Sequence, residues 1–246
     1  MRERILERLP LPVGLAFVAL AIGLGSVFIA DGIRDRNRSD VITVTGSAKR
    51  RIVSDYVIWE VSVSSQQPTV AEAARELAGW SDRTRTFLRD KGARDEEVTV
   101  RPIFTETLTD EAGKTDQAGK VTGFRLTRSF QVRSARVDAI SQLAENSSEL
   151  VAQGIPIVAQ PIQYVYTKLP SLRPQLLQEA IKDALRRADV VVKATGARLG
   201  KLRGVNVGVF QVTTPNSTEV SDYGVYDTST LEKDVTAVVS VTFAVR

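Results

Sequence analysis

An uncharged segment of 22 residues, Leu9–Ala30, constrains this chain more than any other feature of its sequence. As a helix with a rise of about 1.5 Å per residue it would be roughly 33 Å long, enough to cross a hydrocarbon core about 30 Å thick. Pro10 and Pro12 stand near its start, where a missing backbone N–H costs least. We therefore expect one N-terminal transmembrane helix. The expected division is an N-terminus at 1–8, a transmembrane anchor at 9–30, a polar linker at 31–40 and a folded domain at 41–246.

Arginines flank the apolar segment on both sides, three before it and three at 34–38, so charge bias alone does not fix its orientation. We expect an uncleaved anchor with a cytoplasmic N-terminus. The alternative is a cleaved signal peptide, although Phe28 is bulky where a cleavage site needs a small residue. Ala19 and Gly23 have the small-residue spacing that lets two membrane helices approach closely, which makes them candidates for helix pairing.

The composition of the 246 residues excludes several classes of protein. The chain has no cysteine, which excludes disulfides, zinc–thiolate sites and thiol nucleophiles. It has no histidine, the commonest general base at neutral pH and a common metal ligand. The formal net charge of +4 is too small for the basic face of a nucleic-acid-binding protein. We therefore expect no enzymatic activity, no catalytic residue, no cofactor, no bound metal and no nucleic-acid partner.

Several stretches show the alternation of a half-buried strand. Val57, Trp59, Val61 and Val63 fall on one face of the second stretch, with polar residues between them. Gly46-Ser47 is expected to separate this stretch from a first strand that begins at residue 41. Further strands are predicted at 98–104, 124–132, 155–166, 205–209 and 235–245.

Three segments have helical periodicity. The first follows Thr69, which with Glu72 forms a capping box, and stops at Gly92. The second is expected over about 135–151. The third is expected to start at Pro174 and stop at Gly196. Its predicted buried stripe is Leu177, Ala180, Ile181, Ala184, Ala188, Val191 and Thr195.

The order of these elements favours hairpins over crossovers. That order predicts an α+β fold with largely antiparallel sheets and three helices packed on them, in addition to the N-terminal transmembrane helix.

Two motifs resemble parts of a nucleotide-binding or a catalytic site, but the residues around them do not favour either function. Gly113-Lys114-Thr115 ends like a phosphate-binding loop, but Leu108 stands where the first glycine is required, and the segment is a hairpin tip. Ser47 and Lys49 could form a serine–lysine nucleophile. Two arginines follow Lys49 directly, so an apolar setting for this lysine is not expected, and a turn at the end of a strand is the favoured interpretation.

Candidate interaction surfaces lie near the C-terminus. Tyr223 and Tyr226 are aromatic residues in a polar loop, of the kind that interfaces use. The valine-rich strand at 235–245, with Val239 and Val241 at its middle, could pair or stack between protomers. An equally open interpretation makes that strand a central member of its own sheet.

These residues and motifs resemble the SIMPL-domain family of bacterial envelope proteins, which includes the periplasmic immunogenic protein and the oxidative-stress defence protein. The resemblance spans about 41–246 and lies in Gly46 with the arginine pair after it, in IVSDYVIWEVSVS, and in the third helix with the ATGARLGKL stretch that follows. An anchored subtype of the family also has an N-terminal hydrophobic segment. The resemblance implies an exported or anchored protein that assembles into ring- or channel-like oligomers, with a loose link to stress tolerance. It implies no active-site residues.

Together these arguments predict a non-enzymatic protein of the bacterial inner membrane, single-pass, with its C-terminal domain in the periplasm. Its expected partners are other copies of itself and the membrane. If the signal is cleaved, the protein would instead be secreted to the periplasm. The alternative function is a ligand- or peptide-binding module whose mouth is formed by the loops 109–120 and 214–231, with a small molecule or peptide of unknown identity as its partner.

Overall fold

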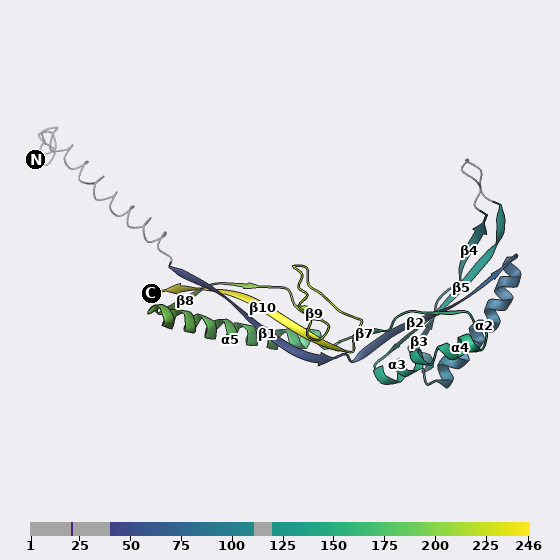
Figure 1. Cartoon of the computed structure of the whole chain (residues 1–246), viewed down its shortest axis with the longest axis horizontal. Helices are drawn as coiled ribbons and strands as arrows, with labels where there is room; N and C mark the ends of the chain where they lie inside the picture. The colour runs from purple at the N-terminus through teal and green to yellow at the C-terminus, as the bar shows by residue number, and fades with distance from the viewer. Residues whose placement is uncertain (1–20, 22–39, 111–119) are drawn as a thin grey trace, which may run out of the picture. The chain divides into compact units, whose positions relative to one another are not determined.

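The structure, a computed structural model, describes residue 21 and residues 40–110 and 120–246. Figure 1 shows the order of the elements along the chain. The predicted anchor at 9–30, including Ala19 and Gly23, lies outside the described residues apart from Ala21, as do 111–119 of the predicted loop. Among the residues that are described, no helix is both long and apolar enough to cross a membrane.

The described residues form an α+β fold of antiparallel strands and helices, which confirms the predicted fold class. The three helices expected from the sequence are present, and the second of them is divided in two. The elements are β1 (Val41–Val53), β2 (Tyr56–Gln67), α2 (Val70–Asp90), η2 (Asp95–Glu97), β3 (Val98–Val100), β4 (Phe104–Thr109), β5 (Val121–Ser134), α3 (Val137–Glu145), α4 (Ser148–Ala152), β6 (Ile157–Ala159), β7 (Gln163–Val165), α5 (Leu169–Thr195), β8 (Leu199–Val207), β9 (Gln211–Thr213) and β10 (Glu232–Val245).

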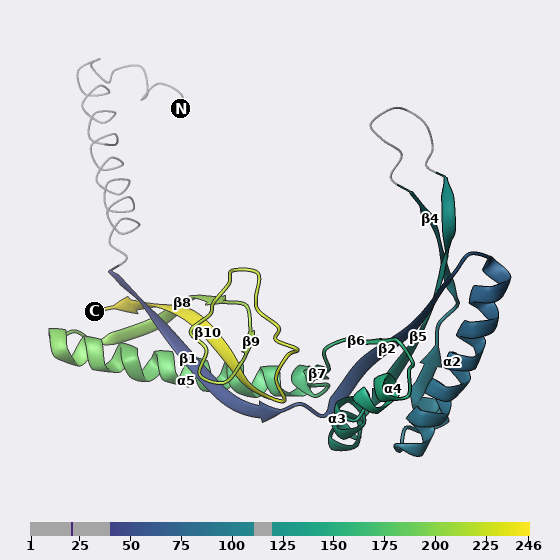
Figure 2. The same ribbon diagram turned by 45° about the vertical axis from the view of Figure 1, so that its right-hand side comes forward.

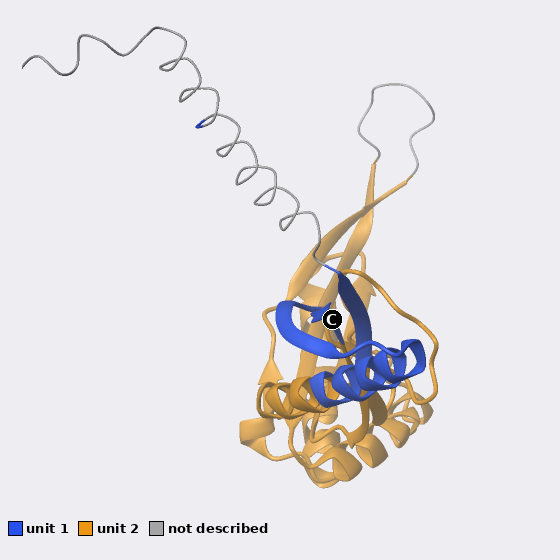
Figure 3. Cartoon of the chain, turned by 90° about the vertical axis from the view of Figure 1, so that its left-hand side faces the viewer, with its two compact units in different colours: residues 1–46, 181–207, 239–246 blue, residues 47–180, 208–238 orange. Residues whose placement is uncertain are grey.

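The chain divides into two compact units, coloured separately in Figure 3. Unit 1 contains Met1–Gly46, Ile181–Val207 and Val239–Arg246, and unit 2 contains Ser47–Ala180 and Gly208–Val238. Strands β1 and β10 and helix α5 therefore contribute residues to both units.

Unit 2 holds a six-stranded antiparallel sheet in the order β3-β5-β2-β6, with β4 paired to β5 and β7 paired to β2. Strand β2 pairs with β5 along nearly its whole length, from Val57 opposite Ser134 to Gln67 opposite Phe124. The predicted alternation is confirmed, because the odd-numbered residues of β2 face the core. Helices α2 and α3 contact this face (Figure 2). The largest buried side chains of the cluster include Trp59, Phe130, Leu77, Leu88, Ile140 and Leu143.

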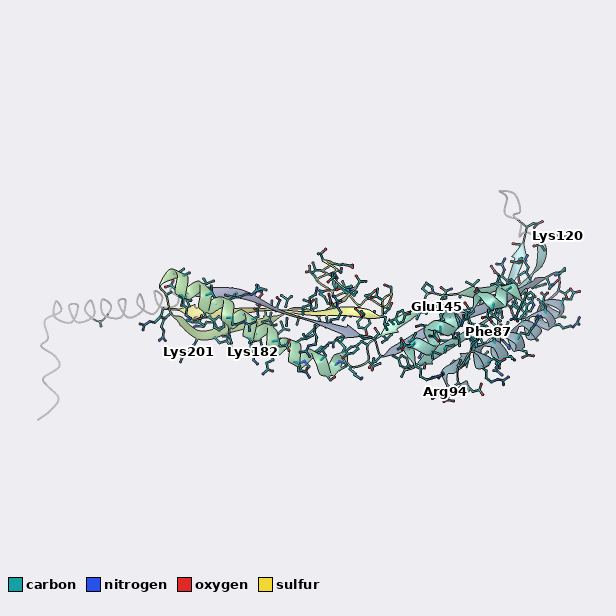
Figure 4. All side chains as sticks on the ribbon, turned by 60° about the horizontal axis from the view of Figure 1, so that its bottom comes forward. Phe87, Arg94, Lys120, Glu145, Lys182 and Lys201 are labelled. Carbon is teal, nitrogen blue, oxygen red and sulfur yellow. The ribbon has the colours of Figure 1, made fainter. Side chains whose placement is uncertain are left out.

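Helix α2 begins and ends where the sequence predicted. The Thr69 hydroxyl accepts a hydrogen bond from the Glu72 backbone N–H at 3.3 Å and donates one to the Glu72 carboxylate at 2.7 Å. Gly92, with φ of 99°, follows the last turn in a conformation that side chains disfavour. Figure 4 shows Phe87 of this helix among the packed side chains of unit 2, where it is 7% exposed.

Unit 1 is built from the start of β1, the end of α5, β8 and the end of β10. Strand β10 pairs with β8 antiparallel, with Val239 opposite Val207 and Val241 opposite Val205. The buried residues contributed by α5 are Ala184, Ala188 and Val192, and those contributed by β10 are Val239, Val241 and Phe243.

The predicted break at Gly46-Ser47 is wrong. Strand β1 continues through both residues to Val53, and the chain turns at Ser54-Asp55 instead. The physical reason is pairing, because β1 neighbours β10 in the sheet, and side chains cross-link the two strands within unit 1. The Thr43 and Thr242 hydroxyls lie 2.9 Å apart, and those of Thr45 and Ser240 lie 3.3 Å apart.

Helix α5 begins at Leu169, five residues before the predicted start, and Pro174 lies inside it. Leu169 and Leu172 are 5% and 6% exposed, so their burial extends the apolar stripe backwards past the proline. The predicted stop at Gly196, with φ of 72°, is confirmed. Leu176 is buried instead of the predicted Leu177. Val192 is buried instead of the predicted Val191, which is 41% exposed.

Three other predicted elements are divided. The helix expected over 135–151 is two helices, α3 and α4. Helix α3 ends at Asn146, and the Ser147 hydroxyl donates a hydrogen bond to the Ala144 carbonyl at 2.6 Å. The strand expected over 98–104 is interrupted at 101–103, where Pro102 has no N–H to donate to a neighbour. The segment 155–166 contains β6 and β7, with Pro161 between them.

Candidate functional site

A cavity of about 810 Å³ lies in unit 2, between the 214–231 loop and the strands beneath it. This volume falls within the range of roughly 300–1,000 Å³ typical of small-molecule sites. We call it the loop cavity. Its lining residues are Ser47, Lys49, Gly208, Val209, Gln211, Thr213, Ser217, Thr218, Glu219, Val220, Ser221, Asp222, Tyr223, Thr236 and Val238.

The floor of the loop cavity is one face of paired strands. In β1 the side chains of Ser47 and Lys49 are exposed, whereas Ala48 between them is buried and points the other way. Thr236 of β10 lies opposite Gln211 of β9 in the antiparallel register. The alternation of the strands thus places the polar side chains of Ser47, Lys49 and Thr236 on the floor, beside Val209 and Val238.

Asp234 fixes the start of the loop. Its carboxylate accepts hydrogen bonds from Arg51 Nε at 2.8 Å and from the backbone N–H of Asn216 at 2.9 Å, and it pairs with Lys49 Nζ at 2.9 Å. The Arg51 hydrogen bond, aided by those from Asn216 and Lys49, holds the pKa of Asp234 well below its ordinary value of 3.8 although burial opposes this. Asn216 has a positive φ of 61°, so the chain turns sharply here.

Asp227 and Lys233 fix the end of the loop. The Lys233 side chain is fully buried, and its ammonium lies 3.0 Å from Asp227 Oδ2 and donates to the Thr230 carbonyl. Ser229 and Thr230 hydroxyls each donate to the same carboxylate at 2.6 Å. Burial alone would raise the pKa of Asp227, but these hydrogen bonds outweigh it and hold the pKa well below 3.8.

Gln211 holds the middle of the loop. Its side-chain amide donates to the Ser221 carbonyl at 2.6 Å and accepts from the Val225 backbone N–H at 2.8 Å. The residue is 7% exposed, so both hydrogen bonds lie at least partly shielded from water. The loop is thereby attached at 216, at 221–225 and at 227–233, and the cavity is preformed.

The two predicted interface tyrosines have different environments. Tyr223 lines the loop cavity and is 98% exposed. The Tyr226 hydroxyl accepts from the Tyr166 backbone N–H at 3.2 Å and donates to the Tyr166 carbonyl at 3.3 Å. Tyr223 therefore has a free aromatic face, whereas Tyr226 helps to attach the loop.

Val239 and Val241, predicted at an interface, are 0% and 1% exposed. Strand β10 lies between β1 and β8, which agrees with the open alternative that made it central in its own sheet. The backbone and side chains available to a partner belong to its neighbour β8, where Leu202, Val205 and Val207 are 57%, 45% and 46% exposed.

Ser47 and Lys49 lie inside β1 rather than at a turn, and both line the loop cavity. The Lys49 ammonium forms an ion pair with the Asp234 carboxylate at 2.9 Å. Among the described residues, no group of three or more histidine, cysteine, aspartate or glutamate residues is arranged to hold a metal ion.

Sequence reasoning identified the loop but missed Gln211, Asp227, Lys233 and Asp234, the residues that hold it. Lys233 and Asp234 stand beside Glu232 at the start of a strand and look like an ordinary solvated charge run. Asp234 is paired with Arg51, 183 residues away in the sequence, and Lys233 is paired with Asp227 through the turn that precedes the strand.

Comparison with known proteins identifies one family. A comparison with curated proteins found no match. A family model described as "SIMPL: Protein of unknown function (DUF541)" matches residues 42–243, which covers nearly the whole of the predicted domain. The chain therefore belongs to the SIMPL (DUF541) family.

Proposed function

We propose that the protein is a non-enzymatic component of the bacterial cell envelope that belongs to the membrane-anchored subtype of its family and self-associates into a ring- or channel-like oligomer. The observation that carries self-association is strand β8. It lies at the end of the order β1-β10-β8, so within the described residues one of its backbone edges has no strand beside it. An edge strand of this kind is a template for pairing with another chain.

The side chains of β8 favour a protein partner over water. Leu202, Val205 and Val207 expose between 45% and 57% of their surface along one nine-residue strand. Lys201, labelled in Figure 4, and Arg203 lie on the same strand. Such charges disfavour unselective edge pairing, so a specific partner is expected. A second copy of the chain presents the same surface each time, so it can be such a specific partner.

Three further parts of the proposal rest on the sequence and the site. The anchor rests on the uncharged Leu9–Ala30 segment, which ends ten residues before Asp40, and it supports an inner-membrane location with the domain in the periplasm. The non-enzymatic part is supported by the lack of histidine and cysteine and by the ion pair of Lys49. The link to stress tolerance rests on the family resemblance alone.

The test is the mass of the full-length protein in detergent, measured by light scattering with correction for bound detergent. The wild type should form a discrete oligomer, and Val205→Lys should reduce it to smaller species. Val190→Lys is the matched control, because Val190 is a 66% exposed valine of α5 in the same unit. Gly23→Ile tests the alternative that the oligomer is held by anchor helices. A monomeric wild type, or an oligomer whose mass does not change in Val205→Lys, would contradict the proposal that β8 mediates self-association.

Topology is tested separately with reporters fused after Arg38 and at the C-terminus. Reporters that require export should be active at both positions. Cytoplasmic signals from both fusions would exclude a periplasmic domain. N-terminal sequencing of the mature protein distinguishes the anchored form from one secreted after cleavage.

A second candidate function, a periplasmic ligand-binding module, is favoured by one observation, the preformed loop cavity. It uses the predicted 214–231 loop, whereas most of the 109–120 loop lies outside the described residues. Thr236→Trp should fill the cavity and abolish binding of fragments found by ligand-observed NMR. Thr105→Trp, at an exposed position of β4, is the control. If no fragment binds the wild type, this candidate fails.

A further inference from the structure

Hydroxyl groups dominate the polar lining of the loop cavity. They come from the floor strands and from the loop above them. The residues are Ser47, Thr213, Ser217, Thr218, Ser221 and Thr236. A hydroxyl can both donate and accept a hydrogen bond. Those of Ser217 and Ser221 already accept from the backbone N–H groups of Glu219 and Tyr223, at 3.0 Å and 3.3 Å, and still have a proton to donate. This lining therefore matches a ligand that itself carries many hydroxyl groups.

The charges around the cavity disfavour an anionic ligand. Lys49 is the cation of the lining, and its ammonium is already paired with Asp234 at 2.9 Å. Glu219 and Asp222 also line the cavity, and both are exposed. Within the described part of the chain neither carboxylate forms an ion pair. Carboxylates accept strong hydrogen bonds from ligand hydroxyls, and they repel ligand carboxylates and phosphates.

An aromatic ring with a free face stands at the same cavity. Tyr223 is 98% exposed, and Val220, three residues before it, is 80% exposed. A saccharide ring offers an apolar C–H face together with hydroxyls at its edge, which suits an aromatic platform beside hydroxyls and carboxylates. The attachments of the loop at Gln211 and Asp234 hold these groups in place before a ligand arrives.

An extended peptide fits the cavity less well. Peptides commonly bind sheets by adding a strand to a free edge. The floor is a sheet face, and β9 and β10 are already paired there, at Val212 with Val235 and at Gln211 with Thr236. Their backbone groups are therefore committed to each other, and side-chain hydroxyls remain to recognise a ligand.

We propose that the loop cavity binds an uncharged oligosaccharide, with Tyr223 stacking on a sugar ring and Glu219 and Asp222 accepting hydrogen bonds from its hydroxyls. This inference rests on the second candidate function and adds the chemical class of its ligand. It is independent of self-association through β8, which lies in unit 1.

The experiment is calorimetric titration of the full-length protein in a detergent without a sugar headgroup, such as a polyoxyethylene ether. The probes are the tetramer of N-acetylglucosamine, maltotetraose and tetragalacturonate, so that neutral and acidic sugars of one length are compared. We expect at least one neutral sugar to bind at least about tenfold more tightly than tetragalacturonate.

Tyr223→Ala should weaken neutral-sugar binding by at least about tenfold, because the stacking surface is lost. Phe104→Ala is the matched control, since Phe104 is a 69% exposed aromatic residue of β4 outside the cavity, and it should bind as the wild type does. Circular dichroism of each variant checks that it is folded.

Three results would overturn the proposal: no binding of either neutral sugar, tighter binding of tetragalacturonate, or unchanged binding by Tyr223→Ala. If neither neutral sugar binds the wild type, but fragments bind the wild type and do not bind Thr236→Trp, only the proposed ligand class is wrong. If fragments do not bind the wild type either, the proposed ligand-binding function is wrong as well.

Discussion

Two regions of unit 2 are held together by different forces. The core between the β2–β5 sheet and its helices is apolar, and Trp59, Phe130 and Leu77 are each about 1% exposed. The 214–231 loop is held by buried or nearly buried charges, with Lys233 at 0% and Asp234 at 2% exposure. Apolar contacts have no preferred direction, so side chains held by them pack together and fill the available space. Ion pairs instead hold particular atoms of the chain at defined positions. This difference explains how the loop can be fixed and still leave a cavity beneath it.

The largest expected effect is in the apolar core. Phe130→Ala should lower the free energy of unfolding by about 3–5 kcal/mol, because it removes a buried ring and leaves a cavity. Urea unfolding followed by tryptophan fluorescence measures it, with Trp59 as a buried reporter. Phe104→Ala, the exposed counterpart, should change the value by less than about 0.5 kcal/mol. Similar losses from the two variants would contradict the assignment of the core.

Removing one half of the buried ion pair should cost nearly as much. Asp227→Ala leaves the Lys233 ammonium with the Thr230 carbonyl as its remaining partner, and we expect a loss of about 3 kcal/mol in the free energy of unfolding. The double variant Asp227→Ala/Lys233→Met removes the buried charge as well, so it should recover at least half of that loss. A double variant as unstable as the single one would show that the charge itself is not what makes the single change costly.

The two regions also differ in how far the sequence predicts them. The period-two pattern around Trp59 and the capping box at Thr69 are local, so the buried face of β2 and both ends of α2 were predicted. Asp234 depends on Arg51, 183 residues away, and nothing local to either residue marks the pair. The loop was predicted as a surface for recognition, but its cavity requires the register of β9 on β10, which no single segment encodes. The early start of α5 and the unbroken β1 were missed for a similar reason, because tertiary burial and strand pairing outweigh the local signals of proline and glycine.

Acid should weaken the ionic contacts while the apolar core is unaffected. Glu97 tests this at the border of the core. It accepts hydrogen bonds from Arg136 Nε at 3.0 Å and from Ser134 at 2.6 Å. The Arg136 hydrogen bonds, opposed by burial and aided by Ser134, lower the pKa of Glu97 from 4.5 to about 2.

A carboxyl group whose pKa is lowered by folding stabilises the protein fully above its unfolded pKa, and this stability is lost as pH falls through the folded value. We therefore expect Glu97→Gln to cost about 2 kcal/mol near pH 7, and this cost should shrink between about pH 5 and about pH 2. Urea unfolding of both proteins at a series of pH values measures it. Glu149→Gln, which removes an exposed ion pair with Lys91, should cost less than about 0.5 kcal/mol. A cost for Glu97→Gln that does not change with pH would refute the role of its charge.

The smallest expected effect concerns a polar contact that is local and solvent-exposed. Thr69→Ala removes the hydroxyl that accepts the Glu72 N–H and donates to the Glu72 carboxylate, and it should cost about 1 kcal/mol in unfolding free energy. Thr69→Ser keeps the hydroxyl and should restore most of that stability. Because the cap satisfies one backbone donor at the first turn, its loss should fray the start of α2 without opening the core around Leu77. Amide hydrogen exchange separates these outcomes: faster exchange confined to the first turn supports a local role, whereas faster exchange throughout α2 would mean that the cap and the core are one cooperative unit.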